Sequence, residues 1–161
     1  MEAIRQNVSS LRTAYRDTGV LQKYGALLDS LDSIVPDRAA HIDRGYVADV
    51  LKQIQASNPN QGPLKVDYKL TAEGVVLDLA ENSELSDIGP LERLPLIHLD
   101  LANTKVSDLN PLEDLPLENL SLEGCPVSDL GPLSDSPVRI LNINATPVES
   151  LFPLRKLALE E

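Results

Sequence analysis

Aromatic residues are scarce in this sequence: of its 161 residues none is Trp, one is Phe and four are Tyr. The hydrophobic core must therefore be almost entirely aliphatic, and leucine supplies most of it. The chain also contains 12 prolines. Because proline breaks helix interiors and removes hydrogen bonds from central strands, this composition excludes one long helical bundle and disfavours ordinary central strands.

Basic residues are also few, 14 against 25 acidic residues, and the net charge is −11. This charge argues against nucleic acid or an anionic membrane as the main partner, since both attract basic surfaces. A single cysteine excludes an internal disulfide framework and a multi-cysteine metal site. The sequence has no apolar run long enough to span a membrane and no signal-peptide pattern at its start, which slightly favours the cytoplasm.

The composition of the chain changes near residue 63. Residues 1–63 contain seven basic and seven acidic side chains, whereas residues 64–161 contain seven and eighteen and hold most of the leucines. Residues 58–63 read Asn-Pro-Asn-Gln-Gly-Pro, a run of turn formers that predicts a connection. We therefore expect a helical N-terminal segment over residues 1–63 and a second domain over residues 64–161.

Apolar residues recur at helical spacing in three stretches of the N-terminal segment, namely Ile4–Tyr15, Leu21–Leu31 and Val47–Ile54. Gly19 leaves open whether residues 2–34 form one helix or two. The apolar face of each predicted helix must pack against another surface. This surface is usually the protein's own core and less commonly a partner protein or a second copy of the chain. His41 lies in a predicted loop or helix start, with no nucleophile assigned to it.

The second domain is built from repeats with a fixed period along the sequence. Every proline after residue 64 falls in one of three columns spaced by 21: Pro90, Pro111, Pro132 and Pro153; Pro95, Pro116 and Pro137; Pro126 and Pro147. Aliphatic residues share the period: Leu99, Leu120 and Leu141; Leu101, Leu122 and Ile143; Val106, Val127 and Val148. Agreement across so many columns indicates a repeat architecture.

One copy of the repeat reads Leu96-x-x-Leu99-x-Leu101-x-x-Thr104-x-Val106, and further copies begin at Leu117 and Val138. The pattern resembles the leucine-rich repeat. Its short period and Ser-Asp-Leu-x-Pro-Leu tail are similar to bacterial, internalin-like repeats over about residues 74–157. The resemblance implies an α/β solenoid of about four coils with a parallel sheet.

Elementary chemistry leads to the same fold. Leu-x-Leu alternation predicts a short strand with both leucines directed inward, stacked about 4.8 Å from the next copy. The Ser-Asp pair is predicted to cap a turn, and proline to set the backbone of the return segment. Because the repeat is too short for a full helix on the back, we expect 3₁₀ turns or irregular structure there, with Leu91 and its equivalents Leu112, Leu133 and Leu154 in the core. Cys125 shares a ladder position with Asn82, Thr104 and Thr146 and is predicted to be a buried, unreactive thiol.

Solenoid ends expose core residues and need caps. Residues 65–70 and 75–79 alternate around a turn at 71–74, which predicts a β-hairpin, and the helix around Val47–Ile54 is expected to cap it. Residues 46–91 are similar to the start of repeat regions in planctomycete serine/threonine kinase-like proteins, which implies a regulatory or sensing module without kinase residues. The segment 157–161 is too short for a cap, so the last coil is frayed, continues, or is covered by another chain.

The outward side of the predicted sheet is the candidate binding surface. Three outward positions of the predicted strands are small or apolar, namely Val76, Ala80 and Ala102. The predicted partner-binding residues are His98, Asp78, Asp100, Asn119, Ser121, Glu123, Arg139, Ile140, Asn142 and Asn144. This face is polar and mildly acidic, and it lacks the Trp and Tyr side chains common in binding hot spots.

Three classes of function are open to this chain. Neighbouring Asp78 and Asp100 admit a cation site or hydrolytic chemistry, but two carboxylates on an open sheet offer neither a metal cage nor a cleft that excludes water. No nucleotide-binding, hydrolase or zinc-protease motif occurs, so we expect no enzyme, no cofactor and no metal. The favoured function is a protein–protein interaction module, and a place within a larger signalling protein stays open. The alternative is a structural or oligomerisation unit that uses the N-terminal helices or the C-terminal coil, so a homo-oligomer stays open as well.

Overall fold

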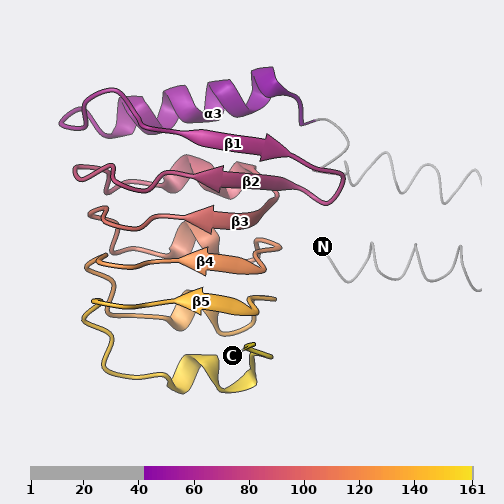
Figure 1. The fold of residues 1–161 in the computed structure, drawn as a ribbon, viewed down its shortest axis with the longest axis vertical. Helices are drawn as coiled ribbons and strands as arrows, with labels where there is room; N and C mark the ends of the chain where they lie inside the picture. The colour runs from indigo at the N-terminus through magenta and orange to yellow at the C-terminus, as the bar shows by residue number, and fades with distance from the viewer. Residues whose placement is uncertain (1–41, 161) are drawn as a thin grey trace, which may run out of the picture. The chain divides into compact units, whose positions relative to one another are not determined.

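The computed structural model describes residues 42–160, so the helices predicted before residue 42, and His41, lie outside the described residues. Within 42–160, no helix is long and apolar enough to cross a membrane. The elements follow one another along the chain as drawn in Figure 1: α3 (Arg44–Ser57), β1 (Asp67–Leu70), β2 (Val75–Asp78), η1 (Gly89–Arg93), β3 (Leu96–Asp100), η2 (Asn110–Leu112), β4 (Asn119–Ser121), η3 (Gly131–Leu133), β5 (Ile140–Asn142) and η4 (Phe152–Lys156).

The five strands form one sheet in the order β1-β2-β3-β4-β5. Strand β1 is antiparallel to β2, as the predicted hairpin requires, whereas β2 to β5 run parallel. The register pairs Leu99 with Leu120, and Leu120 with Leu141, so successive strands are one sequence repeat apart. The 3₁₀ helices η1 to η3 lie behind the sheet, and η4 lies at the end of the stack past β5 (Figure 1). The described residues therefore form a solenoid of the leucine-rich-repeat type.

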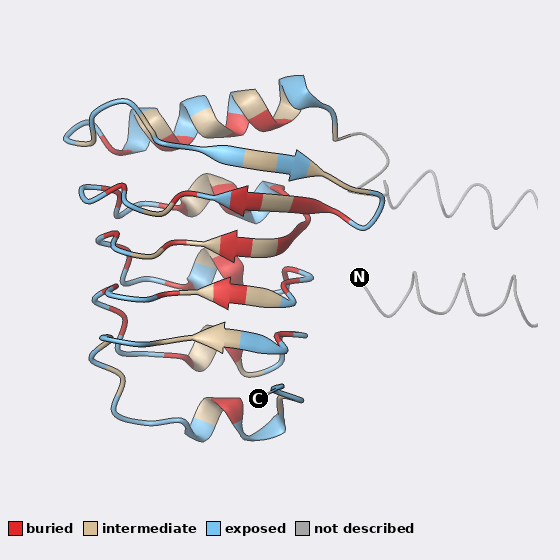
Figure 2. Cartoon of the chain, in the orientation of Figure 1, coloured by how far each residue is buried: buried red, intermediate tan, exposed pale blue. Residues whose placement is uncertain are grey.

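Side chains at repeated positions build each coil. The carboxylate of Asp87 accepts the N–H of Gly89 at 2.8 Å, and Asp108 and Asp129 make the same bond to the residues two positions later. Each of these turns leads into a 3₁₀ helix with proline in its first turn. The leucine after each proline is buried, as predicted, and so are most leucines of the strands; together they form one continuous core (Figure 2).

The polar side chains that stack inside the turns form hydrogen bonds with the backbone and with one another. The Cys125 thiol donates to the carbonyl oxygen of Leu101 in the neighbouring coil at 3.0 Å, and its sulfur lies 3.4 Å from Thr104 Oγ1. Thr146 Oγ1 donates to the carbonyl of Ile143 at 2.7 Å. The 1% exposure of Cys125 confirms the predicted burial of this thiol.

Helix α3 lies at the end of the stack beside β1 (Figure 1). It begins after Asp43, whose side chain accepts the N–H of Tyr46 at 2.8 Å, and its buried residues Val47, Val50 and Ile54 join the core of the repeats. One compact unit extends from Ile42 to the C-terminus and contains both the helix and the repeats. The predicted division near residue 63 stays a prediction for the whole chain, because residues 1–41 lie outside the description.

The connection between α3 and β1 is held by side-chain amides. Asn58, 3% exposed, donates from Nδ2 to the carbonyls of Ile54 and Asp87, both at 2.8 Å. Its Oδ1 accepts the backbone N–H groups of Ser86 and Asp87, both at 2.9 Å. Because one amide serves four backbone groups, the end of the helix is tied to the first turn of the solenoid.

A second pair of amides continues this attachment. Gln61 Nε2 donates to Asn82 Oδ1 at 3.2 Å, and Gln61 Oε1 accepts the N–H of Glu84 at 2.9 Å. The fully buried Asn82 accepts the N–H of Lys65 and returns a bond to the Lys65 carbonyl at 2.7 Å. The composition of residues 58–63 indicated a connection, but not these contacts.

One backbone position after each parallel strand is left-handed. Its φ angles are 61° at Glu81, 57° at Asn103, 70° at Gly124 and 54° at Ala145. Glycine adopts this conformation freely and asparagine tolerates it, whereas the Cβ of alanine is strained there by about 1–2 kcal/mol. Ala145, like Glu81, therefore carries a Cβ strain that Gly124 avoids and Asn103 tolerates.

Replacing Ala145 with glycine should raise the free energy of unfolding by about 0.5–1 kcal/mol, because relief of the left-handed strain exceeds the entropy lost by glycine. Ala102→Gly is the matched control, since Ala102 is not left-handed; that change should lower stability by about 0.5–1 kcal/mol. Urea denaturation of both variants measures the change in the free energy of unfolding. Equal effects at the two positions would contradict the assignment of backbone strain to Ala145.

Replacing Asn58 with alanine should cost about 2–4 kcal/mol, because it leaves several buried backbone groups without partners. Asn60→Ala, at an exposed neighbour in the same connection, should change stability by less than about 0.5 kcal/mol. Thermal unfolding of the two variants tests this, and a mild effect at Asn58 would show that the amide attachment contributes little.

Candidate functional site

The predicted columns of outward residues lie as rows across the sheet. The strand register aligns Val76, His98, Asn119 and Ile140 in one row, and Asp78, Asp100, Ser121 and Asn142 in the next. Ala80, Ala102, Glu123 and Asn144 follow just beyond the strand ends. The structure therefore brings nine of the ten predicted binding residues together on one face, with Arg139 immediately before β5. Their role in binding stays a prediction.

Strand β1 adds two charged residues to this face. Asp67 lies opposite Asp78, so that Asp67, Asp78 and Asp100 form a row of carboxylates on three adjacent strands. Lys69 lies opposite Val76 in the neighbouring row. The repeat spacing did not reveal Asp67, because β1 lies outside the repeat. The alternation of residues 65–70 is the signal for the face on which Asp67 lies, but it does not give its neighbour Asp78.

The aspartates of this row carry negative charge and also accept hydrogen bonds from the backbone of the following turns. Asp78 Oδ1 accepts the N–H of Ala80 at 2.9 Å, and Asp100 Oδ1 accepts that of Ala102 at 2.8 Å. Asn142 Oδ1 makes the equivalent bond to Asn144 at 3.0 Å. One oxygen of each aspartate therefore binds the turn at the end of its strand, and the other oxygen is left for a partner or for water. Within residues 42–160, no group of His, Cys, Asp or Glu side chains is arranged to hold a metal ion.

Neighbouring coils are also linked across the edge of the face. Asn103 Nδ2 donates to Glu81 at 2.7 Å, and Asn142 Nδ2 donates to Glu123 at 2.9 Å. Arg139 forms an ion pair with Glu160 at 2.6 Å. Glu123, Asn142 and Arg139 thus have partners within the chain, which fixes their positions on the surface.

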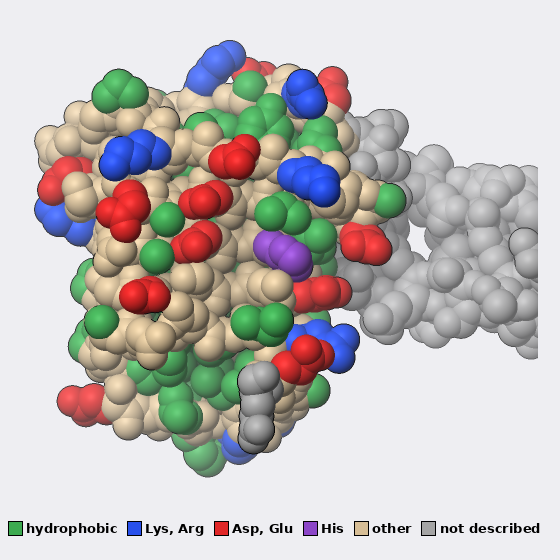
Figure 3. All heavy atoms as spheres, in the orientation of Figure 1, with side chains coloured by type: hydrophobic (Ala, Val, Ile, Leu, Met, Phe, Trp, Pro, Cys, Tyr) green, Lys and Arg blue, Asp and Glu red, His purple; other side chains and the backbone are tan. Residues whose placement is uncertain are grey.

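The charge of the described chain is concentrated in its middle coils. Residues 74–138 carry two basic and 13 acidic side chains, a net charge of −11, whereas residues 42–73 carry four of each. Residues 139–160 carry three basic and two acidic side chains. Acidic side chains accordingly gather over the sheet in Figure 3, where the lower end of the same face is more hydrophobic. The negative potential belongs to the coils of β2 to β4 and not to either end of the described unit.

A depression of about 300 Å³ lies between the turns of the first two coils and is lined by Ser86, Asp87, Ile88, Asp108 and Pro111. The carboxylates of Asp87 and Asp108 already accept the N–H groups of Gly89 and Asn110. Because both carboxylates bind backbone N–H groups of the turns, we assign this depression a structural role and not a ligand site.

No protein-family model matches the chain, and no curated protein matches its sequence. Among solved structures, the chain is similar to internalin C2 of Listeria monocytogenes, with 29% identity over 46% of this chain and a TM-score of 0.42. A second internalin of that organism (inlF) is 22% identical over 70% of this chain, with a TM-score of 0.41. The matches cover 34% and 41% of the two internalin chains.

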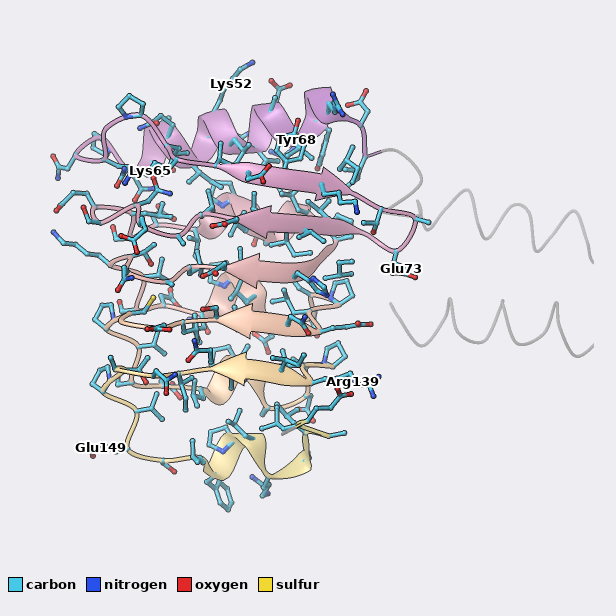
Figure 4. All side chains as sticks on the ribbon, viewed as in Figure 1. Lys52, Lys65, Tyr68, Glu73, Arg139 and Glu149 are labelled. Atoms are coloured by element: carbon cyan, nitrogen blue, oxygen red, sulfur yellow. The ribbon has the colours of Figure 1, made fainter. Side chains whose placement is uncertain are left out.

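Changing Asp67 to lysine should stabilise the protein by about 0.5 kcal/mol at low salt, because an attractive pair with Asp78 replaces a cross-strand repulsion. The control is Glu73→Lys in the exposed hairpin turn (Figure 4), which alters the net charge equally but lies outside the row. Urea unfolding should show the gain for Asp67 alone, and about 0.5 M NaCl should reduce it. Equal gains at both positions would assign the effect to net charge.

Proposed function

We propose that this protein is a non-enzymatic protein–protein interaction module that presents its acidic sheet face to a basic partner. In this proposal the parallel strands belong to about four internalin-like coils, each one sequence repeat long, and α3 is their N-terminal cap. The similarity of residues 46–91 to planctomycete kinase-like proteins supports a place in a larger signalling protein. The observation that carries the proposal is the row Asp67, Asp78 and Asp100 within coils of net charge −11.

The rigidity of this face supports recognition. The turn bonds of Asp78, Asp100 and Asn142 orient their side chains before any partner arrives. A preorganised surface loses little entropy on binding, and a negative surface accelerates encounter with a positive one. The row is exposed on an open sheet, where carboxylates stay hydrated, so general acid–base catalysis receives no support from its geometry.

A second candidate function is oligomerisation. It is favoured by apolar side chains exposed on the last coil, among them Leu151 and Phe152. The alternative route through the N-terminal helices involves residues outside the description.

The variant Asp100→Lys/Glu123→Lys should lose at least tenfold in affinity for a basic partner recovered by cross-linking and mass spectrometry, because two attractions become repulsions. The matched control is Glu92→Lys/Glu113→Lys, which makes the same charge change at exposed positions of η1 and just after η2, behind the sheet. Partner binding measured by titration should survive in the control. Unchanged binding in the sheet variant would overturn the assignment of this face.

A further inference from the structure

Three carboxylates form a regular row across the outward face of the sheet. Asp67, Asp78 and Asp100 lie at matching register positions of the adjacent strands β1, β2 and β3, and Figure 3 shows acidic side chains one below another over these strands. Because neighbouring strands are about 4.8 Å apart, the row is about 10 Å long. Among residues 42–160, none of the three carboxylates forms an ion pair, so each can bind a basic group of a partner.

Two of these carboxylates have fixed positions. Asp78 Oδ1 accepts the N–H of Ala80 at 2.9 Å, and Asp100 Oδ1 accepts the N–H of Ala102 at 2.8 Å. The second oxygens of the two side chains therefore keep a separation that the strands set. A partner binds best when its basic groups repeat at the same interval, because the row then needs no rearrangement.

A second row of outward residues runs beside the carboxylates. It contains Val76, His98 and Asn119, which are half-buried, and it has Lys69 at its β1 end. Because these residues precede the acidic positions by two along the parallel strands, the two rows are about 6.7 Å apart. An α-helix with its side chains is about 10–12 Å wide, so a helix laid across the strands covers both rows.

The spacing of the carboxylates selects the conformation of a basic segment that crosses the strands. In an α-helix, residues i, i+3 or i+4, and i+7 lie on one face, and the first and third are about 10.5 Å apart. In an extended strand the side chains of one face recur at every second residue, so the first and third are about 13.5 Å apart. The helix therefore matches the row of about 10 Å, whereas an extended segment exceeds it by about 3–4 Å.

We propose that the sheet face binds an α-helix of its partner, laid across the strands, with Lys or Arg at positions i, i+3 or i+4, and i+7. This inference rests on the proposed function and names the chemistry of the basic partner. Each basic side chain of the helix meets one carboxylate of the row Asp67, Asp78 and Asp100. The side of the helix over the second row is uncharged, because a basic residue there would be repelled by Lys69.

Synthetic peptides of equal charge test this geometry with the full chain. The helical probe is an Ala-rich peptide of about 15 residues with lysines at i, i+4 and i+7. Its control has the same composition with the lysines at i, i+2 and i+5, which lie on different sides of a helix. The extended probe is a Thr-rich peptide with lysines at i, i+2 and i+4, on one side of a strand.

Fluorescence anisotropy of labelled peptides measures the affinities. The helical probe should bind about tenfold more tightly than the control or the extended probe, because only its lysines repeat at the interval of the row. Its helicity by circular dichroism should rise on binding, since a short helix is marginal in water by itself. Equal affinities of the three peptides would overturn the proposal, as would tighter binding of the extended probe.

A protein variant without charge in the row tests where the helical probe binds. Asp67→Asn/Asp78→Asn/Asp100→Asn removes three charges and keeps the turns, since Asn142 Oδ1 makes the same turn bond at 3.0 Å. This variant should bind the helical probe about tenfold more weakly than wild type.

The matched control makes the same charge change in the turns before the 3₁₀ helices, and asparagine caps such turns as aspartate does. The control variant is Asp87→Asn/Asp108→Asn/Asp129→Asn. It should bind the helical probe as wild type does, and thermal unfolding of both variants verifies that they are folded. Equal losses in the two variants would assign binding to net charge and overturn the proposal.

Failure of this inference is distinguishable from failure of the proposed function. If Asp100→Lys/Glu123→Lys loses the cross-linked partner but wild type shows no preference for the helical probe, the helix is overturned and the acidic face stands. If the partner binds that variant unchanged, the proposed function fails, and the helical partner fails with it.

Discussion

The structure depends on burial of leucines between coils, because a coil only one repeat long cannot shield its own apolar side chains. Leu99 and Leu120 are 3% and 2% exposed, since strands lie on both sides of them. Leu141 occupies the same column in the last coil and is only partly buried. Each coil therefore depends on its neighbours for the burial of its leucines.

The two ends of the described unit differ in how their core residues are covered. At the β1 end, an amphipathic helix supplies Val47, Val50 and Ile54 to the core, and the amides of Asn58, Gln61 and Asn82 fasten the intervening connection. At the β5 end of the described residues, the coil that contains η4 leaves Leu151 and Leu159 exposed. Opening by local unfolding should thus begin at the last coil, where the fewest apolar contacts must be lost.

Many acidic residues combine a structural and an electrostatic role. Asp87, Asp108 and Asp129 begin the return turns, while Asp78 and Asp100 end strands on the exposed face. Five of the 13 acidic side chains of residues 74–138 are therefore held in place by backbone N–H groups. On the sheet face, Asp78 and Asp100 are accordingly both charged and fixed in orientation.

The sequence by itself determined the rows of the sheet, the aspartate caps and the burial of Cys125, because a fixed period aligns equivalent residues wherever the coils stack. It left open whether the returns are 3₁₀ helices or irregular, and the structure shows 3₁₀ helices. Only the tertiary structure decided that Asp67 stands beside Asp78, since the antiparallel β1 lies outside that period. It also decided that Asn58 holds the turn at Ser86 and Asp87, a contact between distant parts of the sequence with no local signature. The same holds for Leu151: it is one repeat after the buried Leu130, and its 59% exposure depends on which residues pack against it within residues 42–160.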